Sequence, residues 1–329
     1  MDVAWFDANG WEEDYFEGRD LGVNIDFYEE PLDSGNVEKA EGYDAVSVFV
    51  TSQVDEDVVK QLDCNLIACR STGYDHVATE KAADQGIPVC NVPEYGGTTV
   101  AEHTFGLMLA LSRKIFSALQ KVEDGDFDHE GLRGFDLKGK KLGVIGTGSI
   151  GKNVIRIANG FDMHVIAHDP QPDRHAAHEM GFMYVELDDL LEQADIVTLH
   201  CPLNDATEHM LSSEEFEKME DVLLVNTARG GLIDQEAMIE ALENGSVRAA
   251  GLDTLEEECY IEDDIRYLEE LEEQCDPRVI LEDHLLMERD DVLVTPHNAF
   301  NSREAMERIA ETTLENIRSS SNVVNSPWS

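Results

Sequence analysis

Residues 140–151 carry the stretch KKLGVIGTGSIG, which decides the fold of the segment around it. The apolar residues at 142–145 predict a short buried strand, and a glycine turn and a helical pattern follow without a gap. In such a turn Gly146 permits the tight bend, Gly148 lets the backbone approach a pyrophosphate, and Gly151 lets the helix pack against the strand. The free N–H groups at the start of the helix attract phosphate. The stretch therefore predicts a dinucleotide-binding strand, turn and helix.

A second strand, HVIAH at 164–168, ends at Asp169, about twenty residues beyond the glycines. A carboxylate at this place accepts hydrogen bonds from ribose hydroxyls and repels a 2′-phosphate. Pro170 follows it, and Arg174 is the nearby cation that could favour a 2′-phosphate. We therefore expect the cofactor to be NAD rather than NADP.

Apolar runs alternate with helical patterns through the first hundred residues and again from residue 140 onward. This alternation is typical of parallel sheets covered by helices on both faces. A Gly-rich turn, EYGGTTV at 94–100, precedes a long helical pattern at 101–123, and we place the passage between two domains at this turn. The last helical pattern, 302–319, is too short to form a domain and is expected to return to the first one. We predict two doubly wound α/β domains, a substrate domain (1–97 and 299–329) and a cofactor domain (98–298).

The charge balance is unusual, because the chain has 70 acidic and 24 basic residues and a formal net charge of -46. Such a surface repels nucleic acid and anionic membranes, so neither is expected as a partner. The acids are dispersed and the chain has only ten lysines. This composition favours a halophilic protein, in which a salty cytoplasm screens the self-repulsion.

Cysteine spacing and the start of the chain bear on the compartment. The six cysteines show no CxxC pair and mostly lie in apolar runs, which is typical of reduced thiols. The first residues, MDVAWFDANGW, lack the basic and apolar regions of a signal peptide, and the most apolar helical pattern is too short to span a bilayer. We expect a cytoplasmic protein.

Three polar residues follow predicted strands in the second half of the chain, namely Arg229, Glu258 and His297. In open parallel sheets ligands bind at the carboxyl ends of strands, so these residues are candidates for chemistry. Histidine is suited to proton transfer at neutral pH, and a carboxylate beside it would favour the charged imidazolium. A guanidinium can hold a substrate carboxylate and polarise the adjacent carbonyl. Each residue also has an ordinary structural explanation, so spacing alone leaves the assignment open.

The motifs taken together resemble the D-2-hydroxyacid dehydrogenase family, and most closely its D-lactate dehydrogenase branch. The resemblance covers essentially the whole chain and rests on GTGSIG with Asp169, LHCPL, VNTARGGLID, GLDTLEEE and TPHNAF in this order. It implies a flavodoxin-like substrate domain with an inserted Rossmann domain and a cleft between them. It also implies reversible hydride transfer between NADH and a 2-oxo acid, with His297 as acid/base, Glu258 as its partner, and Arg229 binding the carboxylate.

The resemblance assigns further residues to the two ligands. At the cofactor it implies Gly146, Gly148, Ser149, Ile150, Gly151, Asp169, Cys201, Pro202, Thr207, Thr227, Ala228, Arg229 and Asp253. At the substrate it implies Ser71, Thr72, Gly73, Tyr95 and Phe300. The sequence departs from the lactate enzymes after Tyr95, where GGTTV replaces a pattern that often includes Asn, and the segment between Glu258 and His297 is long and acidic.

Other functions stay open from the sequence. A reductase of glyoxylate, hydroxypyruvate or bulkier 2-oxo acids would carry the same motifs. The C-terminal binding protein corepressors resemble the same fold, sense dinucleotide and keep an Arg, Glu and His, so an NAD-sensing binding protein is a remote alternative. Assays with a panel of 2-oxo acids would separate these readings.

Two further expectations concern metal and assembly. The histidines at 164, 168, 175 and 178 are spaced as metal ligands can be, but two lie on the strand that leads to Asp169. We expect structural or surface roles for them and no metal site. The helical pattern after Thr99 has more apolar surface than one domain face needs, and related dehydrogenases pair through this region, so we expect a homodimer.

Overall fold

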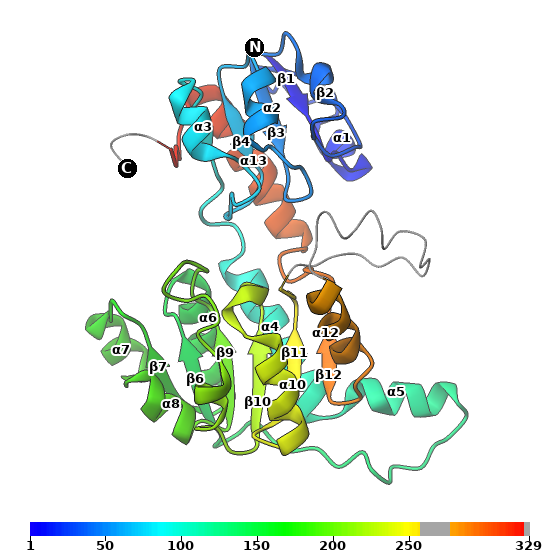
Figure 1. Ribbon diagram of the computed structural model, residues 1–329, viewed down its shortest axis with the longest axis vertical. Coiled ribbons are helices and arrows are strands. Elements are labelled where there is room, and N and C mark those ends of the chain that lie inside the picture. Colours follow the sequence, from blue (N-terminus) through cyan, green and yellow to red (C-terminus); the bar gives the residue numbers. More distant parts are fainter. Residues whose placement is uncertain (257–276, 326–329) are drawn as a thin grey trace. The chain divides into compact units, whose positions relative to one another are not determined.

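The computed structural model describes residues 1–256 and 277–325. It divides the chain into two compact units, Met1–Tyr95 with Ser302–Ser329 and Gly96–Asn301. Each unit is built on its own parallel sheet with helices on both faces (Figure 1). The prediction of two doubly wound α/β sheets is confirmed.

The smaller unit contains a five-stranded sheet in the order β2-β1-β3-β4-β5, and every pair in it is parallel. Along β1 and just beyond it, Ala4 and Phe6 face one apolar core while Val3 and Trp5 face another, as expected for a strand covered on both sides. The strands are β1 Asp2–Trp5, β2 Asn24–Phe27, β3 Ala45–Val48, β4 Ile67–Cys69 and β5 Val89–Cys90. The helical segments are α1 Gly10–Phe16, η1 Val37–Ala40, α2 Glu56–Gln61, α3 Thr79–Asp84 and α13 Arg303–Ser319.

The final helix, α13, belongs to this smaller unit. Ser302 caps it by accepting a hydrogen bond from the Ala305 N–H at 3.2 Å. Its apolar residues Ala310, Leu314 and Ile317 recur at helical spacing and pack into the core around Val3 and Trp5. The last helix thus packs against the first part of the chain.

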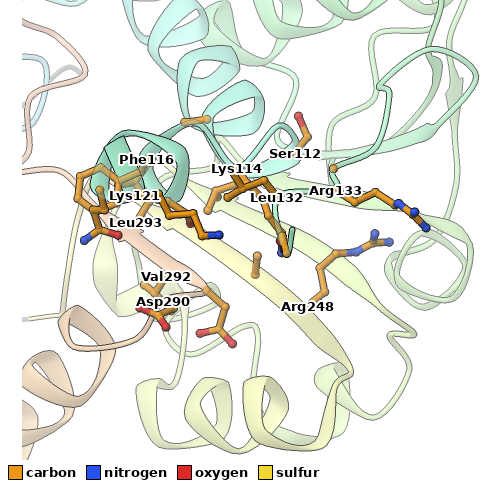
Figure 2. A pocket seen from close by; sticks show the side chains of 18 of the residues that line it. Ser112, Lys114, Phe116, Lys121, Leu132, Arg133, Arg248, Asp290, Val292 and Leu293 are labelled. Carbon is orange, nitrogen blue, oxygen red and sulfur yellow. Dashed lines mark hydrogen bonds between the residues drawn. The ribbon is translucent and has the colours of Figure 1, made fainter. Parts of the chain in front are cut away.

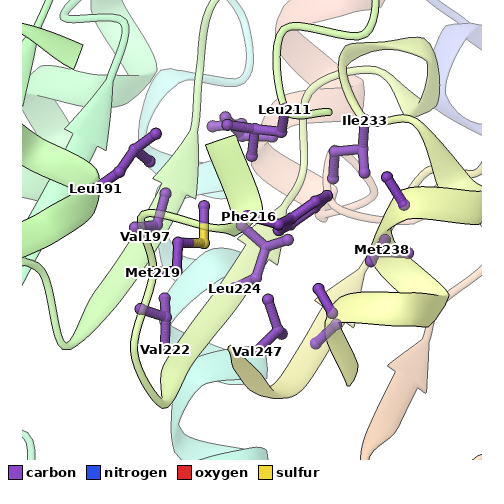
Figure 3. Close-up of a cluster of buried hydrophobic side chains, with 14 of the residues drawn as sticks. Leu191, Val197, Leu211, Phe216, Met219, Val222, Leu224, Ile233, Met238 and Val247 are labelled. Atoms are coloured by element: carbon purple, nitrogen blue, oxygen red, sulfur yellow. The ribbon is translucent and has the colours of Figure 1, made fainter. Parts of the chain in front are cut away.

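The larger unit contains a seven-stranded parallel sheet in the order β12-β11-β10-β9-β6-β7-β8. Its two faces are covered by separate apolar clusters, one of which is drawn in Figure 3. The strands are β6 Lys141–Ile145, β7 His164–His168, β8 Met183–Tyr184, β9 Ile196–Leu199, β10 Val222–Asn226, β11 Val247–Leu252 and β12 Val292–Val294. The helical segments are α4 Gly97–Ser112, α5 Ile115–Glu123, α6 Ser149–Gly160, α7 Arg174–Met180, α8 Leu187–Gln193, α9 Ser213–Phe216, η2 Gly230–Leu232, α10 Gln235–Asn244 and α12 Pro277–Met287.

The strand order of the larger unit creates a switch point between β6 and β9. From β6 the chain proceeds to β7 and β8 on one side, and it then returns to build β9 to β12 on the other side. At such a point the loops that follow two neighbouring strands diverge and leave room for a ligand at their carboxyl ends. The glycine turn follows β6, so the fold places it at this position.

The helical pattern predicted as one helix over 101–123 is two helices, α4 and α5, with a break between them. Lys114 has a left-handed backbone conformation, with φ at 51°. The carbonyl of Ser112 accepts a hydrogen bond from the Phe135 N–H at 2.9 Å, which takes it out of the helical ladder. A Cβ on Gly134 would lie 2.0 Å from the same carbonyl oxygen, so this close approach requires glycine. The break therefore depends on a segment that follows about twenty residues later in the chain.

Candidate functional site

The glycine turn after β6 has the geometry that a dinucleotide requires. Gly146 has φ at 91°, and a Cβ there would lie 2.6 Å from the His200 carbonyl group at the end of β9. A Cβ on Gly151 would lie 2.1 Å from the Gly146 oxygen, so α6 could not pack as closely with any other residue. A Cβ on Gly148 would meet nothing within 4 Å. The turn thus leaves an open face before the first N–H groups of α6, including those of Ser149 and Ile150, and fits a pyrophosphate.

Asp169, directly after β7, is held against this turn. Its carboxylate accepts hydrogen bonds from the Thr147 N–H and hydroxyl, both at 2.8 Å, and from the Gln171 N–H at 2.8 Å. Burial acts to raise the pKa of Asp169, but these hydrogen bonds outweigh it and hold the pKa below its ordinary value. The group is therefore an anion at neutral pH. A pocket of about 620 Å³ opens beside it, and Arg174 also lines this pocket.

The loop after β9 forms the other side of the switch point. Burial lowers the pKa of His200 to about 3 and raises the pKa of Cys201 to about 11, so both side chains are neutral at physiological pH. The Thr207 hydroxyl donates to the Pro202 carbonyl at 2.6 Å and accepts from the Asn204 N–H at 2.9 Å. The predicted cofactor residues Cys201, Pro202 and Thr207 therefore lie in one fixed loop.

The next loop carries Arg229 after β10. Asn226 shapes it, because its side chain donates to the Arg229 carbonyl at 2.8 Å and accepts from the Ala228 N–H at 3.0 Å. The Thr227 hydroxyl lies 2.9 Å from that of Thr104 on α4. One guanidinium nitrogen of Arg229 donates to the Ala228 carbonyl at 2.8 Å. The guanidinium group is planar, and its fork of N–H donors matches the geometry of a carboxylate.

The loops after β10 and β11 touch each other. A Cβ on Gly230 would lie 1.9 Å from the Leu255 oxygen, so only glycine fits between them. The carboxylate of Glu256, the residue after Leu255, accepts a hydrogen bond from His209 Nε2 at 2.7 Å. The predicted catalytic Glu258 lies outside the described residues.

Asp253, directly after β11, organises the loop that contains His297. The Asp253 side chain is 1% exposed and accepts hydrogen bonds from the Thr295 hydroxyl at 2.5 Å, the Asn298 N–H at 2.9 Å and the Ala299 N–H at 2.8 Å. Its own carbonyl accepts from the His297 N–H at 2.8 Å. The Asp253 carboxylate thus binds loop residues that precede His297 and loop residues that follow it.

Electrostatics and backbone geometry at this loop are consistent with a fixed histidine. Burial acts to raise the pKa of Asp253, yet its hydrogen bonds, foremost that from His103, hold the pKa below the ordinary value of 3.8. His297 has a left-handed backbone with φ at 46°, a conformation that is uncommon for a residue other than glycine. The Phe300 ring lies 6.4 Å from the His297 ring and meets it edge to face. The resemblance assigned Asp253 to the cofactor, but nothing in the sequence singled out His103.

The predicted substrate loop lies in the smaller unit, after β4. Ser71 Oγ donates to the Gly73 carbonyl at 2.5 Å, and Thr72 Oγ1 donates to the Val92 carbonyl at 2.9 Å. Asn91 donates its side-chain amide to the Thr72 carbonyl at 2.8 Å. These bonds direct the carbonyl groups inward and fix the loop, which is what anion binding by its N–H groups would require.

Arg70, which precedes that loop, and Tyr95, which is predicted to contact the substrate, also have defined partners. Arg70 is buried, donates to Ser47 Oγ at 3.0 Å and to the Phe6 carbonyl at 2.6 Å, and lies 3.4 Å from the Glu12 carboxylate. The carbonyl of Tyr95 accepts from the Arg308 guanidinium at 2.6 Å and 2.9 Å. The loop therefore begins at a buried ion pair, which anchors its first residue.

A larger pocket, of about 1050 Å³, lies elsewhere in the larger unit (Figure 2). It is lined by the end of α4, by α5 and by the starts of β11 and β12, and none of the predicted site residues lines it. The starts of parallel strands are at the opposite edge of the sheet from the glycine turn. This pocket is therefore not the site of the predicted chemistry.

Two features are absent from the part of the chain that the structure describes. Within residues 1–256 and 277–325, no group of three His, Cys, Asp or Glu side chains is arranged to hold a metal ion. No helix in the same part of the chain is long and apolar enough to cross a membrane.

Comparisons with known proteins agree with this geometry. The profile of a family described as D-isomer specific 2-hydroxyacid dehydrogenase, NAD binding domain, matches residues 105–299. D-lactate dehydrogenase of Escherichia coli is 36% identical over 327 residues, which cover 96% of each chain. The structure of a pyruvate reductase of Chlamydomonas reinhardtii is similar, with a TM-score of 0.87, 36% identity, and coverage of 96% of this chain and 95% of that one. D-lactate dehydrogenase of Aquifex aeolicus, solved with NAD and lactic acid, has a TM-score of 0.85, 28% identity and 99% coverage of both chains.

Proposed function

Because the chain belongs to the D-isomer specific 2-hydroxyacid dehydrogenases, we propose that it interconverts a 2-oxo acid and a D-2-hydroxy acid of the pyruvate and D-lactate type. Membership of this family makes it an NAD-dependent oxidoreductase acting on CH–OH groups. The observation that carries this proposal is the arrangement of three neighbouring strand ends. Arg229, Asp253 and His297 follow β10, β11 and β12, and Asp253 binds the His297 loop directly. The smaller unit is then the substrate domain and the larger unit the NAD-binding domain.

The proposed mechanism assigns one task to each side chain. Reduced nicotinamide, when bound, supplies a hydride to the carbonyl carbon of the 2-oxo acid. His297 delivers a proton to the carbonyl oxygen, which becomes the hydroxyl group, and takes it back in the reverse reaction. Arg229 binds the substrate carboxylate and polarises the carbonyl. Glu258 is proposed to favour the protonated form of His297.

The proposed cofactor contacts lie along the carboxyl edge of the seven-stranded sheet. The glycine turn and the start of α6 would hold the pyrophosphate, and Asp169 would accept the hydroxyl groups of the ribose. The remaining contacts are assigned to Cys201, Pro202, Thr207, Thr227, Ala228, Arg229 and Asp253. For the substrate we propose the N–H groups of 71–73, together with Tyr95 and an apolar contact from Phe300.

The experiment that tests this function is a panel of 2-oxo acids. NADH oxidation should be fastest with pyruvate or a close analogue, and slower with glyoxylate, hydroxypyruvate and bulkier acids. NADPH should give a lower kcat/KM because the anionic Asp169 repels a 2′-phosphate. Faster turnover of hydroxypyruvate or a bulkier acid would assign the alternative substrate class. No turnover of any acid would favour an NAD-sensing binding protein.

We also propose that the protein is halophilic and cytoplasmic. The net charge of -46 supports salt adaptation, since an unscreened surface of this kind repels itself. The cysteines in the described part of the chain, Cys64, Cys69, Cys90 and Cys201, are free thiols, as expected in a reducing compartment.

A homodimer is proposed through α5 and the 1050 Å³ pocket beside it. No residue of α5 is buried, and its apolar side chains Ile115, Phe116, Leu119 and Val122 are 47–57% exposed. Exposed apolar patches of this kind mark interaction surfaces. Five basic and five acidic residues line the pocket, whereas the whole chain has 24 basic and 70 acidic residues. Here two copies could meet without the repulsion that acts over most of their surfaces.

Light scattering at molar KCl should therefore give twice the chain mass of 36.7 kDa. Replacing both Phe116 and Leu119 with glutamate should give a monomer, because two charges would be buried in an apolar contact. Met183→Glu is the control, since Met183 is 67% exposed at β8, the other edge of the sheet. A monomeric wild-type mass would contradict the proposal.

A further inference from the structure

His103, on α4, contacts the carboxylate that organises the His297 loop. Its Nε2 atom lies 3.1 Å from the Thr295 hydroxyl oxygen and 3.3 Å from Asp253 Oδ1. Asp253 and Thr295 are themselves joined by a hydrogen bond of 2.5 Å. His103 is therefore part of a three-residue network that connects α4 to the ends of β11 and β12.

The direction of these hydrogen bonds follows from the chemistry of the groups. An ionised carboxylate only accepts, so the Thr295 hydroxyl gives its proton to Asp253. The Thr295 oxygen can then accept, and His103 must carry hydrogen on Nε2 to donate to it or to Asp253. His103 is thus a donor in this network, and Asp253 receives hydrogen bonds from α4 as well as from the His297 loop.

The network has a direct connection to the reacting histidine. The same Asp253 carboxylate accepts from the N–H groups of 298 and 299, and the N–H of His297 donates to the carbonyl groups of Asp253 and Thr295 at 2.8 Å and 2.9 Å. His297 also has the uncommon left-handed backbone described above. A conformation of this kind persists only where its surroundings determine it. A shift of the Asp253 carboxylate would therefore be passed to the position of the imidazole.

We propose that His103 is a positioning residue for the acid/base reaction, acting through Asp253 and Thr295 on His297. This inference rests on the proposed function, in which His297 transfers the proton. His103 itself need not touch the substrate or the cofactor. Its role is to keep the proton donor within reach of the carbonyl oxygen, because a displacement of about 1 Å can cost about a hundredfold in rate.

The test uses His103→Leu, which removes the donor. We expect kcat for pyruvate reduction to fall about 10- to 100-fold, while the KM for NADH changes less than about twofold. The solvent deuterium isotope effect on kcat should increase, because proton delivery from a displaced acid becomes more rate-limiting. His103→Gln, which keeps a side-chain N–H donor, should recover part of the rate. Glu102→Gln is the matched control on the same helix, and circular dichroism reports whether each variant is folded.

A double variant separates positioning from a general structural effect. In the H297Q background, His103→Leu should change the residual rate less than about threefold, since the group that it positions is already absent. An equal loss in both backgrounds would overturn the inference, and so would wild-type kcat in a folded H103L enzyme. After either of these two results, a low rate of the H297Q variant alone would still support the proposed role of His297. If H297Q keeps wild-type turnover, the role of His297 fails and the inference fails with it.

Discussion

Replacing His297 with glutamine should lower kcat for pyruvate reduction by about 10²- to 10⁴-fold, which is the range that a positioned general acid contributes. Glutamine has a similar size and can donate a hydrogen bond, but it cannot give up a proton to the developing alkoxide. The loop should stay in place, because Asp253 binds the backbone N–H groups of 298 and 299 rather than the imidazole. The affinity for NADH should therefore be nearly unchanged.

Steady-state kinetics and a fluorescence titration with NADH measure these two quantities on the same preparation. His164→Gln is a suitable control, since this exposed histidine lies at the start of β7, at the edge of the sheet away from the strand ends. If the H297Q enzyme kept most of its turnover, the proton donor would be a different group. A loss of NADH affinity equal to the loss of rate would instead indicate that the loop had collapsed.

Removal of salt should have the second large effect. In dilute buffer the net charge of -46 is screened only over about 10 Å or more, whereas at 1 M salt the screening length is about 3 Å. Repulsion between carboxylates then destabilises the compact chain. We expect the circular dichroism signal and the turnover to be lost together below roughly 1 M KCl.

Two controls show whether screening is the cause. Sucrose favours burial by exclusion from the protein surface but does not screen charge, so it should not replace KCl. Neutralising the exposed carboxylates on α1 and at its C-cap in the E13Q/D14N/E17Q variant should lower the KCl concentration at which half of the chain is folded. Full structure and turnover of the wild type without added salt would exclude a halophilic protein.

The local signals in the sequence predicted the strands and turns well. The apolar run at 142–145 lies within β6, and the glycines at 146 and 151 fill positions where a Cβ would collide with backbone. The strand and the Gly151 contact depend on neighbours in the chain, and Gly146 is indicated by the positive φ that the turn requires. The alternation of strands and helices was likewise sufficient to predict the two parallel sheets, and the series of motifs was sufficient to identify the family, which the comparisons confirmed.

Features that depend on distant residues were not predictable. The break between α4 and α5 requires Phe135 to take the carbonyl of Ser112, and nothing in the helical pattern itself indicates this. His103 stands in the first half of an apolar helix, and its partners Asp253 and Thr295 come some 150 to 190 residues later. A polar residue within the apolar pattern of α4 was the available signal, but it could not identify the partners.

The smaller unit is assembled from both ends of the chain, and this affects how the chain folds during synthesis. Residues 1–95 leave the ribosome first, yet the core around Val3 and Trp5 also needs Ala310, Leu314 and Ile317 from α13. The larger unit, residues 96–301, is complete before that helix has been made. The usual order, in which the N-terminal part folds first, is thus reversed. The face of the five-stranded sheet that α13 covers therefore stays uncovered while the whole larger unit is translated. During this time the nascent chain exposes an apolar surface to which chaperones can bind.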